Sequence, residues 1–201
     1  MITVVDYGMG NLGSIANMLH RIKVPVNVTS KVSEIENASK LLLPGVGKFD
    51  AAMNKINDSG LRDVLDKKVL NDKTPVLGIC LGMQLLTCSS EEGSVPGLGW
   101  IKASTKKFPM FDDLKVPHMG WNVVDVSNES LLTQSLPKDS RFYFVHSYCV
   151  HVHDSNNSIL KTKYGIEFDS AISHGNVFGT QFHPEKSHKF GMQLLRNFAS
   201  I

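Results

Sequence analysis

The chain has 201 residues, of which 42% are hydrophobic, so it can bury one sizeable core and fits a single domain (1–201) better than two. Its formal net charge is +2, with one local basic cluster between Lys102 and Lys107, so no nucleic-acid or membrane partner is expected. A small polar metabolite and a protein are the ligands that this composition favours. Three features favour a cytoplasmic protein: the first residues do not resemble a basic leader, no apolar run is long enough to cross a bilayer, and the three cysteines are scattered.

The first half of the chain alternates predicted strands with predicted helices. Strands are expected at 2–7, 25–29 and 40–43, and helices at about 14–22, 49–56 and 61–70. Such alternation is typical of a mostly parallel sheet with helices on both faces, in which ligands lie at the carboxyl ends of the strands. The sequence therefore predicts an α/β fold.

A glycine-rich turn separates the first strand from the first helix. Gly8-Met9-Gly10-Asn11-Leu12-Gly13 has the form G-x-G-x-x-G, which occurs in dinucleotide sites. Such a site also needs an acidic residue at the end of the second strand, where this chain has Ser30-Lys31. A tight turn and close helix packing therefore explain the glycines better, and nucleotide binding remains the alternative.

Residues 75–86 carry the first candidate for catalysis. An apolar run passes between Gly78 and Gly82 into a stretch with helical character, with Cys80 at the change. This pattern predicts a buried strand that turns sharply into a helix, where large neighbours would crowd the bend and the thiol would leave the sheet edge. A lone cysteine in an apolar run is usually a core residue, so a catalytic interpretation needs a base elsewhere.

The glycines of Pro44-Gly45-Val46-Gly47, in a predicted loop, would let backbone N–H groups approach a ligand, although a plain turn fits equally well. After Gly93, short strands with turns between them suggest antiparallel additions to the same core. Within that part, Pro117, Met119 and Trp121 are bunched in a polar region. They are either core residues or anchors for a protein partner, and composition alone favours the core.

One strand is expected over 141–153, with Cys149, His151 and His153 on the face opposite to its aromatic residues. This row invites a zinc interpretation. Three ligands from one strand rarely converge on one ion, however, so we favour a polar stripe that faces solvent and expect no metal.

A candidate base lies near the end of the chain. A hairpin is expected from strands at 171–173 and 177–182, and the second strand leads into His183-Pro184-Glu185. In an extended chain, His183 and Glu185 lean to the same side and can hydrogen-bond, so they could serve Cys80 as base and orienting carboxylate. A closing helix at 189–200 is expected to bury Met192, Leu195 and Phe198.

These residues also carry a family resemblance. Gly78-Ile79-Cys80-Leu81-Gly82-Met83-Gln84 with Phe182-His183-Pro184-Glu185 resembles the class I glutamine amidotransferases, which hydrolyse glutamine through a Cys, His, Glu triad. Further segments are similar to the glutaminase subunits of imidazole glycerol phosphate synthases, at 6–8, 44–47, 117–122, 143–148 and 181–187. The resemblance covers essentially the whole chain. It implies a three-layer amidotransferase fold, with a mostly parallel central sheet and antiparallel additions in the C-terminal half.

The resemblance implies roles for individual residues. Cys80 would attack L-glutamine to give a glutamyl thioester, with His183 as base and Glu185 as its orienter. Backbone N–H groups of the oxyanion hole would come from Leu81, Val46 and Gly47. Glutamine would be held by Gly47, Gln84, Ser147 and Tyr148. A partner face would include Asn11, Pro117, Met119, Trp121 and Lys186, which reverses the composition-based preference for core.

The resemblance also implies a partner and a form of control. Ammonia would pass into a (β/α)₈-barrel cyclase subunit, in a heterodimer without a cofactor, in histidine biosynthesis. Activity would stay low until that partner binds its own ligand, and the 44–47 segment would have to reorient. Three alternatives remain: a paralogous subunit that feeds another synthase, such as one for surface-sugar modification, a generic cysteine hydrolase, and a non-catalytic nucleotide-binding module.

Overall fold

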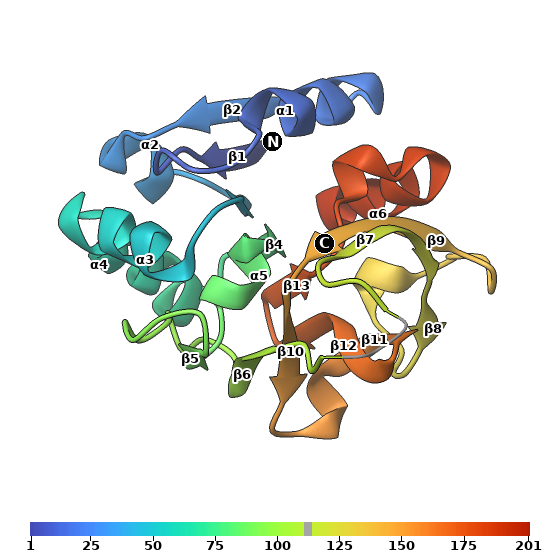
Figure 1. The fold of residues 1–201 in the computed structure, drawn as a ribbon. Helices are drawn as coiled ribbons and strands as arrows, with labels where there is room; N and C mark the ends of the chain where they lie inside the picture. Colours follow the sequence, from blue (N-terminus) through green and yellow to red (C-terminus); the bar gives the residue numbers. More distant parts are fainter. Residues whose placement is uncertain (111–113) are drawn as a thin grey trace.

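A mixed sheet of 11 strands is the centre of the fold in the computed structural model, which describes residues 1–110 and 114–201 (Figure 1). Its main path runs β2-β1-β3-β4-β13-β12-β10-β6-β5, and β11 pairs with both β12 and β8. These strands are β1 (Ile2–Val5), β2 (Val26–Thr29), β3 (Leu41–Gly45), β4 (Val76–Cys80), β5 (Ser89–Ser90), β6 (Ala103–Lys107), β8 (Asp125–Val126), β10 (Tyr148–Val152), β11 (Ser158–Tyr164), β12 (Ile166–His174) and β13 (Val177–Thr180). Neighbours from β2 to β13 are parallel, whereas β12, β10, β6 and β11 join through antiparallel pairs.

Helices cover both faces of the parallel part of this sheet (Figure 1). They are α1 (Leu12–Arg21), α2 (Val32–Glu36), α3 (Phe49–Asp58), α4 (Leu61–Asp66), α5 (Leu81–Leu85) and α6 (His188–Ser200). A π-helical turn, η1 (Lys67–Asn71), continues α4, and 3₁₀ turns form η2 (Leu131–Thr133), η3 (Ser155–Asn157) and η4 (Pro184–Lys186). The α/β class and the layered arrangement expected from the sequence are confirmed.

Two hydrophobic clusters fill the spaces between the sheet and its two helical layers. Val4 of β1 packs with α1 and α6 in one cluster, whereas its neighbour Val5 packs with α3 and α4 in the other. This alternation follows from the two-residue period of a strand, which sends successive side chains to opposite faces. Burial of each such Val or Leu side chain contributes roughly 1.5–3 kcal/mol to the free energy of unfolding.

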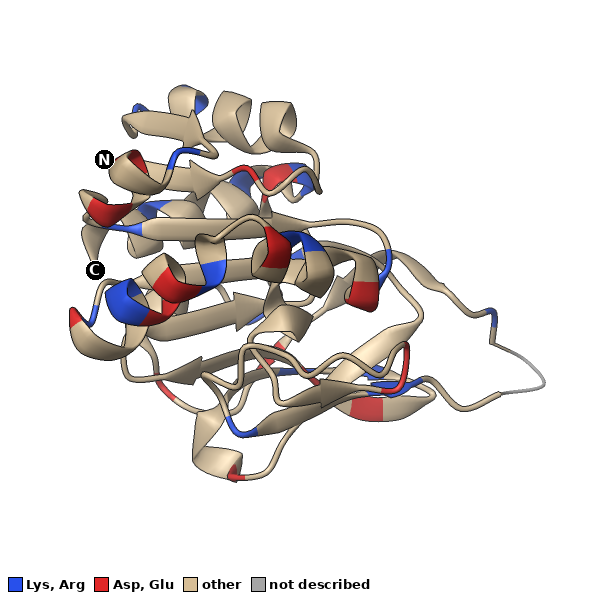
Figure 2. Ribbon diagram, turned by 90° about the vertical axis from the view of Figure 1, so that its left-hand side faces the viewer, with Lys and Arg blue, Asp and Glu red and all other residues tan. Residues whose placement is uncertain are grey.

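The outer surface of α2, α3 and α4 carries interspersed acidic and basic residues (Figure 2). Within the described residues, no helix combines the length and apolar character needed to cross a membrane. Nor do residues 1–110 and 114–201 bring three or more His, Cys, Asp or Glu side chains together as a metal site.

The expectation of one strand over 141–153 is wrong. A bend at Ser147 divides the segment into two strands. The first, β9 (Arg141–His146), pairs with β7 (His118–Val123) in a separate two-stranded sheet, and the second, β10, joins the main sheet. The predicted stripe therefore does not form. Cys149 is fully buried between β6 and β12. Of the two histidines, His151 is partly buried and His153, beyond the end of β10, is exposed.

Smaller differences concern the ends of elements. Pro44 and Gly45, expected in a loop, are the last residues of β3 because they pair with Ile79 and Cys80 of β4. Strand β13 ends at Thr180 rather than 182. In α6, Leu195 and Phe198 are buried as expected, but Met192 is only partly buried.

The bend between β4 and α5 is packed too closely for side chains at its glycines. A Cβ atom on Gly82 would lie 1.9 Å from the carbonyl oxygen of Leu43, and one on Gly78 would lie 2.6 Å from the backbone of Gly82. The crowding expected at this bend is therefore present. Because the obstructing atoms are backbone, a side chain could enter only if β3 or α5 moved.

We predict that Gly82→Ala lowers the free energy of unfolding by at least about 1–3 kcal/mol, since overpacking forces backbone shifts. The matched control is Gly13→Ala, where an added Cβ meets no atom within 4 Å in an exposed helical position. That variant should gain roughly 0.4–1 kcal/mol from helix propensity. Urea denaturation measures both, and a Gly82→Ala protein as stable as the unmodified one would refute the packing argument.

Candidate active site

Cys80 occupies the apex of the bend between β4 and α5. Its backbone has φ 55 and ψ −111, a region that costs a non-glycine residue of order 1–3 kcal/mol and persists only where the surroundings impose it. The close packing around Gly78 and Gly82 imposes it here. The side chain is 7% exposed and lines a cavity, so the thiol lies at the sheet edge as the sequence predicts.

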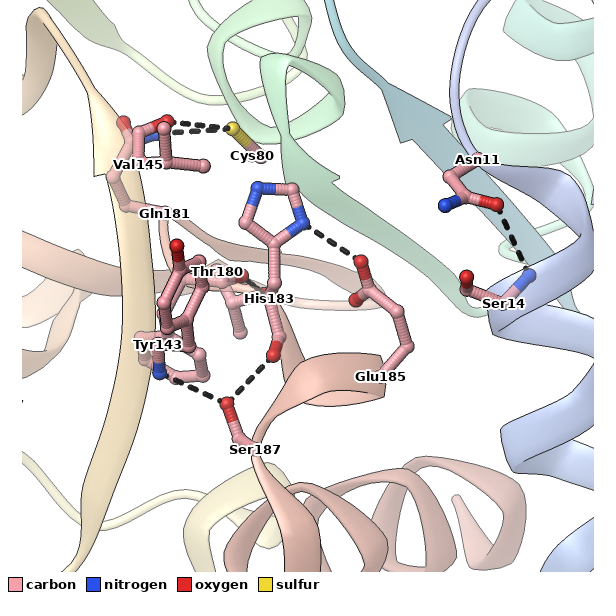
Figure 3. Close-up of polar contacts among 11 residues, drawn as sticks. Asn11, Ser14, Cys80, Tyr143, Val145, Thr180, Gln181, His183, Glu185 and Ser187 are labelled. Carbon is pink, nitrogen blue, oxygen red and sulfur yellow. Dashed lines mark hydrogen bonds and ion pairs between the residues drawn. The ribbon is translucent and has the colours of Figure 1, made fainter. Parts of the chain in front are cut away.

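His183 and Glu185 follow β13, the parallel neighbour of β4. Nδ1 of His183 lies 2.7 Å from Oε1 of Glu185, and both side chains are buried. The sequence suggested that this pair forms along an extended strand, and the structure differs. Instead His183 precedes the 3₁₀ turn η4, which contains Glu185. Figure 3 shows the imidazole between Cys80 and the carboxylate.

The turn that carries His183 is fastened to β9. The backbone N–H of His183 donates to the carbonyl of Tyr143 at 2.9 Å. The hydroxyl of Ser187 donates to the carbonyl of His183 at 2.6 Å and accepts from the N–H of Tyr143 at 3.0 Å (Figure 3). These bonds hold the backbone of His183 in place independently of Glu185, which contacts the imidazole ring itself.

The charge state of His183 results from opposing effects. Burial lowers its pKa, but interaction with the Cys80 sulfur and with the Glu185 carboxylate outweighs burial and raises the pKa to about 9. Among the described residues, neither Nε2 of His183 nor Oε2 of Glu185 makes a hydrogen bond. Nε2 is therefore available to exchange a proton with Cys80 or with a ligand.

A cavity of about 410 Å³ opens beside Cys80, within the usual size of small-ligand pockets. It is lined by Val46, Gly47, Cys80, Leu81, Gln84, Glu92, Pro117, Val145, His146, Ser147, Tyr148 and His183. The structure thus brings together the residues expected to bind glutamine and to form the oxyanion hole. Glu92, which the sequence did not single out, also accepts a bond from the N–H of Phe49 at 3.0 Å.

Two buried glutamines lie beneath the thiol. The side-chain amide of Gln181 points at Sγ of Cys80 from 3.7 Å, and its oxygen accepts from the amide of Gln84 at 3.1 Å. Gln84 also donates to the carbonyl of Tyr148 at 3.4 Å. Gln181 was not among the predicted site residues. A polar amide directly after the last residue of β13 and two residues before His183 is the signal that could have identified it, because such an amide needs buried partners.

A chain of hydrogen bonds joins β7 to the cavity wall. Nδ1 of His146 lies 2.7 Å from the carbonyl of Tyr148, Nε2 of His146 lies 3.0 Å from Nδ1 of His118, and Nε2 of His118 lies 3.2 Å from the amide of Asn122. Burial lowers the pKa of His118 to about 4 and that of His146 to about 3, so both are neutral near pH 7. Because a carbonyl only accepts, each histidine must carry its hydrogen on Nδ1.

The five residues expected on a partner face are all exposed: Asn11, Pro117, Met119, Trp121 and Lys186. Met119 is 61% and Trp121 46% exposed, so the composition-based preference for a core position is wrong. Trp121 stacks on His188, with ring centroids 5.5 Å apart, and Nζ of Lys186 lies 5.7 Å from the Tyr143 ring centroid. Large exposed apolar side chains on one strand are typical of a protein contact.

Comparisons with known proteins show the family to which the chain belongs. The family described as "Glutamine amidotransferase class-I" matches residues 3–201. Imidazole glycerol phosphate synthase subunit HisH 2 of Methanococcus maripaludis is 54% identical over 198 residues, covering 98% of each chain. Subunit HisH 2 of Pseudomonas aeruginosa is 50% identical over the full length of both chains, and subunit HisH of Bdellovibrio bacteriovorus is 48% identical, also over both full lengths.

Solved structures share the fold at lower identity. A structure described as a glutamine amidotransferase has a TM-score of 0.72 at 18% identity, covering 100% of this chain and 99% of the other. PurLQS from Thermotoga maritima has a TM-score of 0.70 at 18% identity, with 99% of this chain and 97% of that chain covered. At this identity the likeness concerns the fold alone.

We predict that Glu185→Gln lowers the pKa of His183 from about 9, because the variant loses the negative charge that favours the imidazolium. Because the pKa of His183 is higher in the folded protein than its ordinary value of 6.5, the bound proton stabilises the fold fully below pH 6.5. This contribution is lost as the pH rises from 6.5 towards 9. The stability of the unmodified protein should therefore fall more steeply over that interval than that of the variant. NMR titration of His183 is the measurement, and an unchanged midpoint would contradict the assignment of Glu185.

Proposed function

Because the chain belongs to the class I glutamine amidotransferase family, we propose that it is the glutaminase subunit of an imidazole glycerol phosphate synthase in histidine biosynthesis. It hydrolyses L-glutamine to glutamate and ammonia and delivers the ammonia to a (β/α)₈-barrel cyclase subunit, which makes imidazole glycerol phosphate and AICAR. The observation that carries this proposal is that Cys80 and His183 line one cavity, and that His183 is hydrogen-bonded to the buried Glu185 behind it. Since a thiol nucleophile must stay reduced, we propose the cytoplasm as its compartment.

The chemistry follows from the three side chains. His183 takes the proton of Cys80, whose sulfur then attacks the carboxamide carbon of glutamine and forms a tetrahedral intermediate. The imidazolium protonates the leaving nitrogen, the C–N bond breaks, and ammonia departs from a glutamyl thioester. Water, deprotonated by the same imidazole, hydrolyses the thioester to glutamate and restores the thiol. Glu185 holds the imidazole in one orientation and stabilises its cation.

Backbone N–H groups would stabilise the negative oxygen of the intermediate. We assign this role to the N–H of Leu81, directly after the nucleophile, together with one from Val46 or Gly47 on the facing cavity wall. Loss of one such donor in an acyl-transfer enzyme typically costs about 10²–10³ in rate. Gly47, Gln84, Ser147 and Tyr148 surround the space left for the amino and carboxylate groups of glutamine.

The exposed residues of β7 and η4 form the proposed contact with the cyclase. The names of the curated relatives describe subunits, which supports an assembly of more than one chain. Met119 and Trp121 are exposed, Pro117 also lines the cavity, and Lys186 supplies a cation nearby. A partner docked here would close the cavity, so that ammonia leaves without meeting bulk water, where it would be protonated.

Control by the partner is proposed to act on the segment after β3. Val46 is 44% exposed and Gly47 has φ 113, a backbone conformation that L side chains rarely adopt. Both line the cavity. We propose that this segment reorients when the loaded partner is bound, and only then presents its N–H to the oxyanion.

A second candidate function is favoured by two of the relatives' names. The relatives from Methanococcus maripaludis and Pseudomonas aeruginosa are both named HisH 2, with a number. A paralogous role, in which the same triad feeds ammonia to a different synthase, is therefore the alternative. It would be recognised if the chain were activated by that other synthase and not by a histidine-pathway cyclase.

We predict that Cys80→Ala abolishes glutamine hydrolysis by the assembled complex, with a fall of more than about 10⁴-fold, because no other group can form the thioester. Binding to the cyclase, measured by isothermal titration, should be unchanged. Loss of both properties would indicate that Cys80 is needed for folding instead.

We further predict that Trp121→Ala weakens binding to the cyclase by about 2 kcal/mol, roughly 30-fold in Kd, as expected of a buried aromatic anchor. The matched control is Leu70→Ala, because Leu70 is also an exposed apolar residue, at 45%. It lies in η1, which precedes β4, and so near the amino end of that strand and away from the site at its carboxyl end. Equal affinities for the two variants would place the interface elsewhere.

A further inference from the structure

The side chain of Tyr7, at the start of the glycine-rich turn, makes a contact that the mechanism above does not use. Its hydroxyl donates a hydrogen bond to the carbonyl oxygen of Pro44. Tyr7 is 5% exposed, and its ring packs in the hydrophobic cluster that also contains Leu43 and Leu81. A buried hydroxyl with a single main-chain acceptor fixes the position of that acceptor.

The acceptor belongs to the segment that leads to the proposed oxyanion hole. Gly45, whose N–H shares the peptide group with the Pro44 carbonyl, is paired in register with Cys80. A Cβ atom at Gly45 would lie 2.8 Å from the backbone nitrogen of Gly82 and 2.9 Å from the Tyr7 hydroxyl. The Pro44–Gly45 peptide is therefore confined between the tyrosine on one side and the nucleophile bend on the other.

The same turn touches this segment at a further point. A Cβ atom on Gly10 would lie 3.2 Å from Cβ of Pro44, so the turn is seated directly against the proline. This contact gives the Gly8 to Gly13 motif a structural purpose, close approach of the turn to β3. The segment is thus fixed by contacts at Pro44 and Gly45, whereas the next residue, Val46, is exposed.

We propose that Tyr7 is a positioning residue for glutamine hydrolysis, whose hydroxyl holds the Pro44–Gly45 peptide so that the following N–H group reaches the oxyanion above Cys80. The proposal rests on the proposed glutaminase function. It adds that Pro44 and Gly45 stay fixed while the residues after them reorient. Burial raises the pKa of Tyr7, and the neighbouring Cys80 raises it further, so the hydroxyl remains a donor at any pH at which the enzyme would work.

The test is Tyr7→Phe, which removes one oxygen and keeps the ring in its cluster. In the complex with the cyclase and its ligand, kcat for glutamine hydrolysis should fall about 10-fold or more, with KM changed less than about twofold, because an oxyanion contact acts only in the transition state. The matched control is Tyr164→Phe, which loses a hydroxyl bonded to the carbonyl of Lys115 at 2.7 Å, and its kcat should not change.

A second readout separates positioning from damage to the triad. Alkylation of Cys80 by iodoacetamide forms no oxyanion, so its rate should be the same in Tyr7→Phe and in the unmodified protein. Glutamyl thioester formation in a single turnover should be slower in the variant. Both are measured at a temperature where circular dichroism shows the two proteins to be folded.

Three results would overturn the proposal. The first is an unchanged kcat in Tyr7→Phe, and the second is a rise in activity without the partner, which would mean that the bond restrains the segment rather than positions it. Equal slowing of alkylation and thioester formation would also contradict it. If the unmodified complex failed to hydrolyse glutamine at all, the proposed function would fall, and this result is distinguishable from the others.

Discussion

The positive φ angle of Cys80 is the constraint on which the rest of the site depends. Such a conformation is unfavourable for cysteine, and it is held only because Gly78 and Gly82 allow β3, β4 and α5 to approach within contact of one another. The parallel order of β3, β4 and β13 then brings three strand ends to one edge. The segment after β3, Cys80 and His183 therefore meet at the carboxyl ends of these strands although they are far apart in the chain.

Polar groups buried around the thiol give the site its rigidity. Gln181 and Gln84 link the sulfur to the carbonyl of Tyr148, and the His146–His118 pair continues from the same carbonyl towards β7. A buried polar chain of this kind is stable only when every member finds a partner, so each link fixes the position of the next. The proposed partner face and the cavity wall are thereby parts of one connected structure.

Cys80, His183 and Glu185 were predicted from the sequence to lie together, and the structure brings them together because β4 and β13, which lead into them, are parallel neighbours. Their catalytic roles stay a prediction. The pairing of His118 with His146 could not be found this way, since the two residues come from distant segments of the chain. The prediction of a single strand over 141–153 was wrong because the alternation of aromatic or apolar residues with other residues continues through Ser147, where the chain passes from one sheet to the other. Trp121 was misjudged from composition because an apolar contact surface and an apolar core use the same residues.

The central claim is that Cys80 belongs to a site whose activity is controlled by a second subunit. It is tested most directly by the rate of glutamine hydrolysis of the chain alone, with the cyclase, and with the cyclase and its aminoimidazole ribonucleotide substrate. The account predicts little activity in the first two mixtures and a large rise in the third. An isolated chain that hydrolysed glutamine as fast as the loaded complex would contradict it.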